Sequence, residues 1–145
     1  MLHDAVDDPG LHTEAELLAA HVARLREAVE ASGVEVAADA AGLDPETISA
    51  VADGDAAAAA ALDLEAVAAI LALDDGAPGA DAIAAEARDA LLFGMTAGVL
   101  NVDVVAGDVS ADLEPREVQG MLEGRHPMTL RDYAALQHAI AARST

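Results

Sequence analysis

Apolar residues recur at steps of three and four along most of this chain, which is the spacing of amphipathic helices. The first such segment opens on the capping-box pattern Thr13-Glu14-Ala15-Glu16 and closes at Gly33, so a long helix is predicted over 13–32. The same spacing predicts further helices over 35–41, from Pro45 to Asp53, around Leu64 to Leu71, and over 80–97, 102–109, 115–123 and 130–142.

Six alanines at 56–61 separate the third predicted helix, which ends at Gly54, from the segment that begins near Leu64. Either Asp55 or Asp63 can serve as the N-cap of the helix that follows. Because alanine has the highest helix propensity, we expect the alanines to extend that helix backward and not to form a linker.

Two stretches of the chain, Leu43–Gly54 and Leu113–Gly124, share one pattern. Each has an acidic residue before a proline, apolar residues three and six positions after that proline, and a closing glycine. This pattern marks a short helix with both ends specified. The similarity continues into the next helix, where 63–70 corresponds to 129–136. Repetition of this kind indicates a duplicated helical module.

The strongest break in the helical pattern is the segment 74–79, which combines two aspartates with glycine and proline. We therefore predict an all-α fold of two tandem units, of about four helices each, over 13–75 and 80–145. Residues 76–79 would form the linker between the units, and residues 1–12 an acidic N-terminal segment.

Each half has a long helix, a short helix that ends near a glycine, an acid-Pro-opened helix with the pattern Pro-x-x-Ile/Val-x-x-Val/Met, and a capped last helix. This order resembles the helix-turn-helix of lambda-repressor-like regulators. The resemblance implies that the third helix of each unit would enter the major groove of DNA, while the second braces it across the backbone.

The whole sequence also resembles a family of short acidic haloarchaeal proteins of uncharacterised function. The similar segments are Met1-Leu2-His3-Asp4 with Val6-Asp7-Asp8-Pro9, Ile70–Asp75, and Leu122–Arg125 with Pro127–Leu130. This resemblance implies a fold and almost no biochemistry.

Composition sets the environment of the fold. The chain has 27 acidic residues and a net charge of −20, and all seven of its basic residues are arginines. It is also 54% hydrophobic, so the acids should coat a folded surface and not form a disordered tail. The screening length falls from about 10 Å at 0.1 M salt to about 3 Å at 1 M, so concentrated salt removes most of the repulsion. This balance resembles that of cytoplasmic proteins of salt-accumulating archaea.

Several classes of protein are disfavoured. The chain has no cysteine, which excludes disulfides and thiolate metal sites. Its N-terminus is acidic where a secretory signal would be basic, and no apolar run approaches the roughly 18 residues of a membrane span. We expect a soluble cytoplasmic protein that does not bind membranes.

The two candidate recognition helices differ in their chemistry. The outward positions between Glu46 and Asp53 include no cation, so carboxylates would face phosphate there. The second copy offers Arg116 at its start, Gln119 one turn later and Arg125 just past its end. These residue types can bond guanine, adenine and phosphate respectively.

Basic residues are concentrated near the second copy. From Val99 onward the chain has four arginines and seven acids, against three arginines and twenty acids before it. We therefore assign candidate DNA contacts to residues 115–125 and to Arg131. Because concentrated salt removes nonspecific attraction to phosphate, any binding must come from specific contacts.

Titratable groups elsewhere give no catalytic pattern. His3, Asp4, Asp7, Asp8 and His12 lie close together in sequence but without the spacing of a preformed metal site, so we expect a solvated acidic terminus there and no metal.

The other histidines also have structural interpretations. His126 falls in a loop and His138 on the last helix, and neither is accompanied by a serine or cysteine nucleophile or by paired carboxylates. His21 lies on the apolar side of the first helix and is expected to be a hydrogen-bonded core residue. No phosphate-binding glycine loop is present. The sequence indicates no enzyme, cofactor or small-molecule substrate.

Three functions remain. The first is a helix-turn-helix DNA-binding or transcription-associated protein whose second unit contacts DNA. The second is a protein-interaction module that uses the same scaffold without DNA. The third is an acidic mimic of nucleic acid, which predicts carboxylates on one face of the first unit. We place the DNA-binding protein first, because the pattern occurs twice and arginine gathers near the second copy.

Overall fold

The computed structural model describes residues 2–109 and 112–144, and in these ranges it contains helices and no strand. The predicted all-α class is therefore confirmed. In chain order the elements are η1 Pro9–Leu11, α1 Glu14–Ser32, α2 Val34–Ala41, α3 Pro45–Ala52, α4 Ala56–Ala60, α5 Leu64–Leu71, α6 Ala80–Ala97, α7 Val102–Asp108, α8 Pro115–Leu122 and α9 Leu130–Ser144.

The helix ends follow capping residues that are visible in the sequence. At the start of α1, Thr13 Oγ1 accepts from the amide of Glu16 at 3.1 Å, and Glu16 Oε1 accepts from the amide of Thr13 at 2.8 Å. Pro45 and Pro115 occupy the first turns of α3 and α8. A proline there leaves no intrahelical hydrogen bond unmade. The predicted capping box and both proline-opened helices are confirmed.

The expected backward extension through the alanines is wrong. Ala56–Ala60 form a separate helix, α4, in which Asp55 Oδ1 accepts from the amide of Ala58 at 3.1 Å. A continuous helix would use the amide of Leu64 for a bond to the carbonyl four residues earlier. That amide instead donates to the carbonyl of Met128 at 2.8 Å. A tertiary hydrogen bond therefore ends the alanine helix, and the first half has five helices instead of four.

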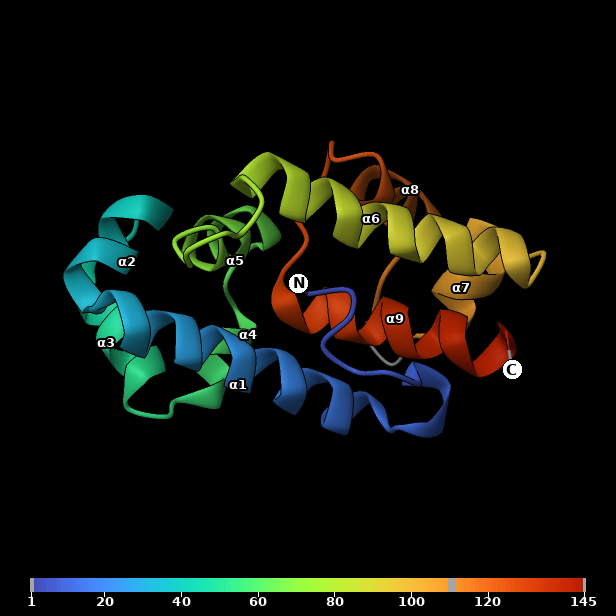
Figure 1. Cartoon of the computed structure of the whole chain (residues 1–145). Helices are drawn as coiled ribbons and strands as arrows, with labels where there is room; N and C mark the ends of the chain where they lie inside the picture. The colour runs from blue at the N-terminus through green and yellow to red at the C-terminus, as the bar shows by residue number, and fades with distance from the viewer. Residues whose placement is uncertain (1, 110–111, 145) are drawn as a thin grey trace.

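Three long helices give the molecule its shape, with α9 in contact with both α1 and α6 and lying between them (Figure 1). The first long helix of each half of the sequence packs against the last helix of the other half, since α1 contacts α9 and α6 contacts α5. The pair α2–α3 lies at one end of the molecule and α7 near the other (Figure 1). One cluster of buried apolar residues joins both halves.

The two halves also exchange backbone hydrogen bonds where their last helices begin. The amide of Leu64 donates to Met128 as described, and the amide of Leu130 donates to the carbonyl of Leu62 at 2.9 Å. These bonds flank an isolated antiparallel bridge between Asp63 and Thr129. Asp63 and Thr129 occupy corresponding positions in the two similar segments 63–70 and 129–136.

A buried polar contact connects α1 to α9. His21 Nε2 lies 2.7 Å from Gln137 Oε1, and the imidazole stands edge-on to the Tyr133 ring with 5.4 Å between ring centroids. Because a carboxamide oxygen only accepts, Nε2 carries the proton. Burial lowers the pKa of His21, so the ring is held neutral. The predicted hydrogen-bonded core histidine is confirmed.

The N-terminal segment is more closely attached than expected. Leu2 is 1% exposed and belongs to the core, and η1 packs against α9. Asp7 and Asp8 are exposed, as predicted for an acidic terminus. Leu2 and the packing of η1 on α9 therefore hold the segment. Periodicity could not identify Leu2, because it lies outside any helix of useful length.

Membrane-spanning character is absent from every individual helix in the described ranges. The pair α6 and α7 meets the length and composition required for a span only when taken together, and it is bent by 102°.

Candidate functional site

Helix α8 has a buried apolar face and an exposed polar face. Val118, Met121 and Leu122 are buried in the core. Arg116 and Gln119 are exposed and lie three positions apart, so they occupy one face of the helix on consecutive turns. The core-facing residues thus fix the helix, while the polar pair is directed outward.

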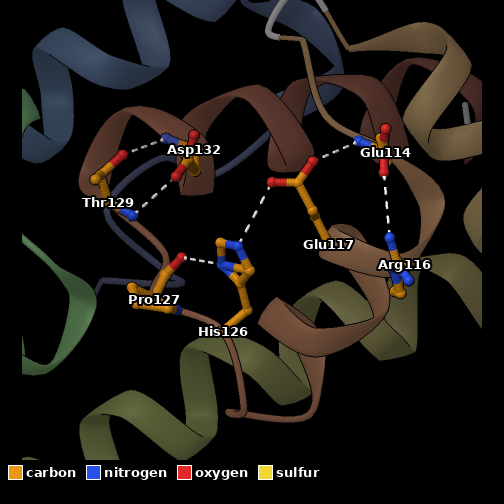
Figure 2. Close-up of polar contacts among 7 residues, drawn as sticks. All are labelled: Glu114, Arg116, Glu117, His126, Pro127, Thr129 and Asp132. Carbon is orange, nitrogen blue, oxygen red and sulfur yellow. Dashed lines mark hydrogen bonds and ion pairs between the residues drawn. The ribbon is translucent and has the colours of Figure 1, made fainter.

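The start of α8 is held by a short hydrogen-bonded network (Figure 2). The amide of Glu114 donates to Glu117 Oε1 at 3.1 Å, and Pro115 occupies the first turn. The Arg116 side chain is 91% exposed, and its Nη2 lies 3.8 Å from Glu114 Oε2. An ion pair this exposed contributes little stability, so the guanidinium is free to reorient toward a ligand.

The end of α8 is organised around one carboxylate. Gln119 Nε2 donates to Glu123 Oε2 at 2.8 Å, and Arg125 Nη2 donates to Glu123 Oε1 at 2.5 Å. These hydrogen bonds, first that from Gln119 and then that from Arg125, hold the pKa of Glu123 below its ordinary value. Glu123 is therefore ionised and competes with any external acceptor for both side chains.

The loop after α8 packs tightly on the helix. A Cβ atom at Gly120 would lie 2.9 Å from Cβ of His126, and the amide of Arg125 donates to the carbonyl of Gly120 at 2.8 Å. Only glycine allows this approach. His126 Nδ1 donates to the carbonyl of Pro127 at 2.9 Å, which leaves Nε2 facing Glu117 Oε2 at 3.5 Å (Figure 2). Arg125 is thus placed by a defined loop.

The fourth predicted DNA contact lies on another element. Arg131 is exposed in the first turn of α9, behind a capping box formed by Thr129 and Asp132 (Figure 2). None of the hydrogen bonds or ion pairs among the described residues joins it to the side chains of α8. The structure therefore places Arg116, Gln119 and Arg125 on or beside one helix and Arg131 on the next.

Two arginines that the sequence analysis did not select support the third helix of each half. Arg88 of α6 donates through Nε to the carbonyl of Met121 at 3.1 Å, in the last turn of α8. Arg26 of α1 donates through Nη2 to the carbonyl of Ala52 at 3.4 Å, at the end of α3. A cation at a helix C-terminus also interacts favourably with the helix dipole. The two arginines stand at different distances from the closing glycines, so sequence spacing gave no signal for them.

The outward face of α3 has the opposite character. The stretch 44–55 contains Asp44, Glu46, Asp53 and Asp55 and no basic residue, whereas 114–125 contains three glutamates and two arginines. The positions that correspond to Arg116 and Gln119 are Glu46 and Ser49. Of the two helices, α8 therefore presents the less repulsive surface to a polyanion.

A separate surface feature lies at the end of α6. The only phenylalanine of the chain, Phe93, is 76% exposed, whereas the only tyrosine is buried. Val99, just after the helix, is 92% exposed and has a φ of 55°, an uncommon conformation for a β-branched residue. Leu92 is also exposed, so three large apolar side chains close in sequence are in contact with solvent at this end of α6.

Metal-ligating side chains do not cluster in the described part of the chain. Among residues 2–109 and 112–144, no three His, Asp or Glu side chains lie together in a way that could hold a metal ion.

Comparison with known proteins gives a family and no activity. The family model described as "Family of unknown function (DUF5791)" matches residues 17–143. No curated protein and no solved structure matches the chain.

Proposed function

We propose that this chain, which belongs to DUF5791, a family of unknown function, is a DNA-binding, transcription-associated protein of a salt-adapted organism. It contacts DNA through the outward face of α8. The observation that carries this proposal is the exposure of Arg116 and Gln119 on consecutive turns of a helix whose other face is locked in the core.

The arrangement of elements supports two repressor-like units in one chain. In each half a short helix packs against a proline-opened helix, α2 on α3 and α7 on α8. An arginine from the long helix caps each proline-opened helix, and the last helices meet at the corresponding residues Asp63 and Thr129. Corresponding residues face each other where two copies are related by an approximate two-fold axis. One chain would then present two repressor-like units, as a dimer of single-unit proteins does.

The chemistry of α8 suits base recognition more than attraction to phosphate. Arg116 can bond the acceptors of guanine and Gln119 can bond adenine, each pairing giving about 1–3 kcal/mol of discrimination. Arg125 and Arg131 are the candidates for contacts with phosphate. Surface carboxylates oppose nonspecific binding, so the affinity for DNA depends on the correct bases being present.

The test begins with selection of binding sequences from a random duplex library at 2–3 M KCl. Replacing Arg116 and Gln119 together by alanine should weaken binding to the selected sequence about 30-fold or more, which corresponds to the lower limit of about 1 kcal/mol for each contact. The matched control replaces the corresponding residues Glu46 and Ser49 by alanine and should retain binding. Failure to select any sequence, or equal losses in both double variants, would contradict the proposal.

A second candidate function is a protein-interaction module, favoured by the exposed Phe93 and Val99. Phe93→Ser should abolish capture of a partner from a nuclease-treated lysate in high salt without lowering the melting temperature. Leu11→Ser, which changes another strongly exposed apolar residue, is the control and should leave capture unchanged. Loss of every partner on nuclease treatment alone would exclude this function in favour of DNA-mediated association.

A further inference from the structure

A cavity of about 460 Å³ lies where the N-terminal segment, α6 and α9 meet. Its volume falls within the range of about 300–1,000 Å³ that is typical of small-molecule sites. Apolar walls come from all three segments, including Leu11, Leu91 and Ile140. The cavity does not include the α8 residues discussed above, so it is a separate site.

Two polar side chains of α9 line this cavity, and both present hydrogen-bond donors. Tyr133 is fully buried, and its hydroxyl has no hydrogen-bond partner within the described residues. Gln137 also lines the cavity, and its Oε1 is already engaged by His21, so its NH₂ group supplies the remaining hydrogen-bonding capacity. A buried hydroxyl without a partner is unfavourable, and a ligand that accepts from it removes this penalty.

One wall of the cavity has little regular structure. The N-terminal segment contains only the three-residue η1 as regular structure before α1 begins. The Tyr133 hydroxyl is closed off from solvent, so the cavity lining must shift slightly before a ligand atom can reach it. Once reached, the hydroxyl would form its hydrogen bond without competition from bulk water.

The charges around the cavity define the ligand further. Asp8 lines the cavity. Burial raises the pKa of the Tyr133 phenol, and the negative charge of Asp4 raises it further. Both acids disfavour a carboxylate or phosphate ligand. A cation beside Tyr133 and Gln137 would lose its hydration and would meet the NH₂ group of Gln137, which only donates, while water screens the attraction of the exposed Asp8. The remaining class is uncharged, because such a ligand meets neither conflict.

We infer that this cavity binds an uncharged, mainly apolar small molecule that presents a carbonyl-type oxygen to Tyr133 and Gln137. The apolar body of the ligand lies against Leu91 and Ile140, and the oxygen accepts the hydrogen bonds that α9 offers. The sequence alone gave no sign of this site, because its walls come from three separate segments.

Binding is tested with Prodan, an uncharged naphthalene ketone whose fluorescence shifts to the blue in apolar surroundings, at 3 M KCl. Saturable one-to-one binding to the whole chain is expected. Ala90→Leu and Ala141→Leu each place a larger side chain in the cavity and should weaken binding at least tenfold. Ala85→Leu, on the exposed face of α6, is the matched control and should bind like the unchanged protein.

Tyr133→Phe tests the polar part of the inference. It deletes one oxygen and leaves no group unpaired, so the melting temperature should not fall, while the affinity for Prodan should drop by about threefold to tenfold. The absence of saturable binding, or unchanged binding in both leucine variants of the cavity, would overturn the site. Unchanged affinity in Tyr133→Phe would overturn the assigned ligand class.

Discussion

Removal of the arginine that caps α8 should destabilise the protein more than removal of its counterpart at α3. Arg88→Met retains most of the apolar stem and deletes two interactions. The first is the 3.1 Å hydrogen bond from Nε to the carbonyl of Met121, and the second is the 2.5 Å ion pair between Nη2 and Glu65. The Arg88 side chain is only 14% exposed, so little solvent replaces what is lost.

The magnitude follows from the surroundings of each interaction. A hydrogen bond from a charged donor contributes about 1.5–3 kcal/mol. Glu65 is 60% exposed, so the ion pair adds less than about 1 kcal/mol. The expected loss of unfolding free energy for Arg88→Met is therefore about 2–3 kcal/mol. For a chain of this length, that loss corresponds to a fall in melting temperature of about 4–12 °C.

Arg26, which caps α3, provides a control in which a smaller loss of stability is expected. Arg26 is 41% exposed, its bond to Ala52 is longer at 3.4 Å, and its Nε is buried with no partner in the described part of the chain. Arg26→Met should therefore cost only about 0.5–1 kcal/mol. Glu65→Gln isolates the ion pair and should cost less than about 1 kcal/mol.

Thermal unfolding followed by circular dichroism at 3 M KCl distinguishes these variants. Selective binding of DNA by Arg88→Met should also weaken, since the cap holds the helix that carries Arg116. If Arg88→Met were no more destabilising than Arg26→Met, the reasoning from burial and bond length would be refuted.

Three further properties can be tested. Leu2→Ala should lower the unfolding free energy in urea by about 2–5 kcal/mol, since Leu2 is 1% exposed; a loss below about 0.5 kcal/mol would mean that the N-terminal segment is solvated. The melting temperature should rise between 0.1 and 3 M KCl, because salt screens a net charge of −20, and a flat profile would contradict salt adaptation. The folded pKa of His21 lies below the ordinary 6.5, so its stabilising contribution is present above pH 6.5 and is lost as the pH falls below that value. Urea unfolding between pH 7.5 and 5.5 should show this loss, and NMR of the imidazole should show His21 neutral where an unperturbed histidine is half protonated.

Local signals in the sequence predicted the helices well, because the information needed for them is local. Thr13 with Glu16, Pro45 and Pro115 define helix starts within a few residues. Apolar spacing also placed His21 in the core, although its partner Gln137 is supplied by a helix far away in sequence. Where a helix end depends only on neighbouring residues, the sequence is sufficient.

The prediction failed where distant segments decide the outcome. The alanine helix ends because the carbonyl of Met128 takes the amide of Leu64, and alanine propensity carries no information about that bond. Leu2 is buried by tertiary packing with no periodic pattern around it. Arg26 and Arg88 cap α3 and α8 from other helices, so no motif within those helices identifies them. Arg116 and Gln119 could be selected from the sequence because they lie on one helix, whereas Arg88, which supports that helix from α6, could not.

Comparison of α3 with α8 separates the requirements of folding from those of function. Both helices share a proline at the start, buried apolar residues at corresponding positions and an arginine cap from another helix. Folding thus constrains the inner face in the same way in both helices. It places few demands on exposed positions, where substitutions usually change stability by less than about 0.5 kcal/mol. The outer face carries Glu46 and Ser49 on α3 and Arg116 and Gln119 on α8, and folding does not account for this difference. The proposed DNA contacts on α8 can therefore be tested with the matching positions of α3 as the internal control.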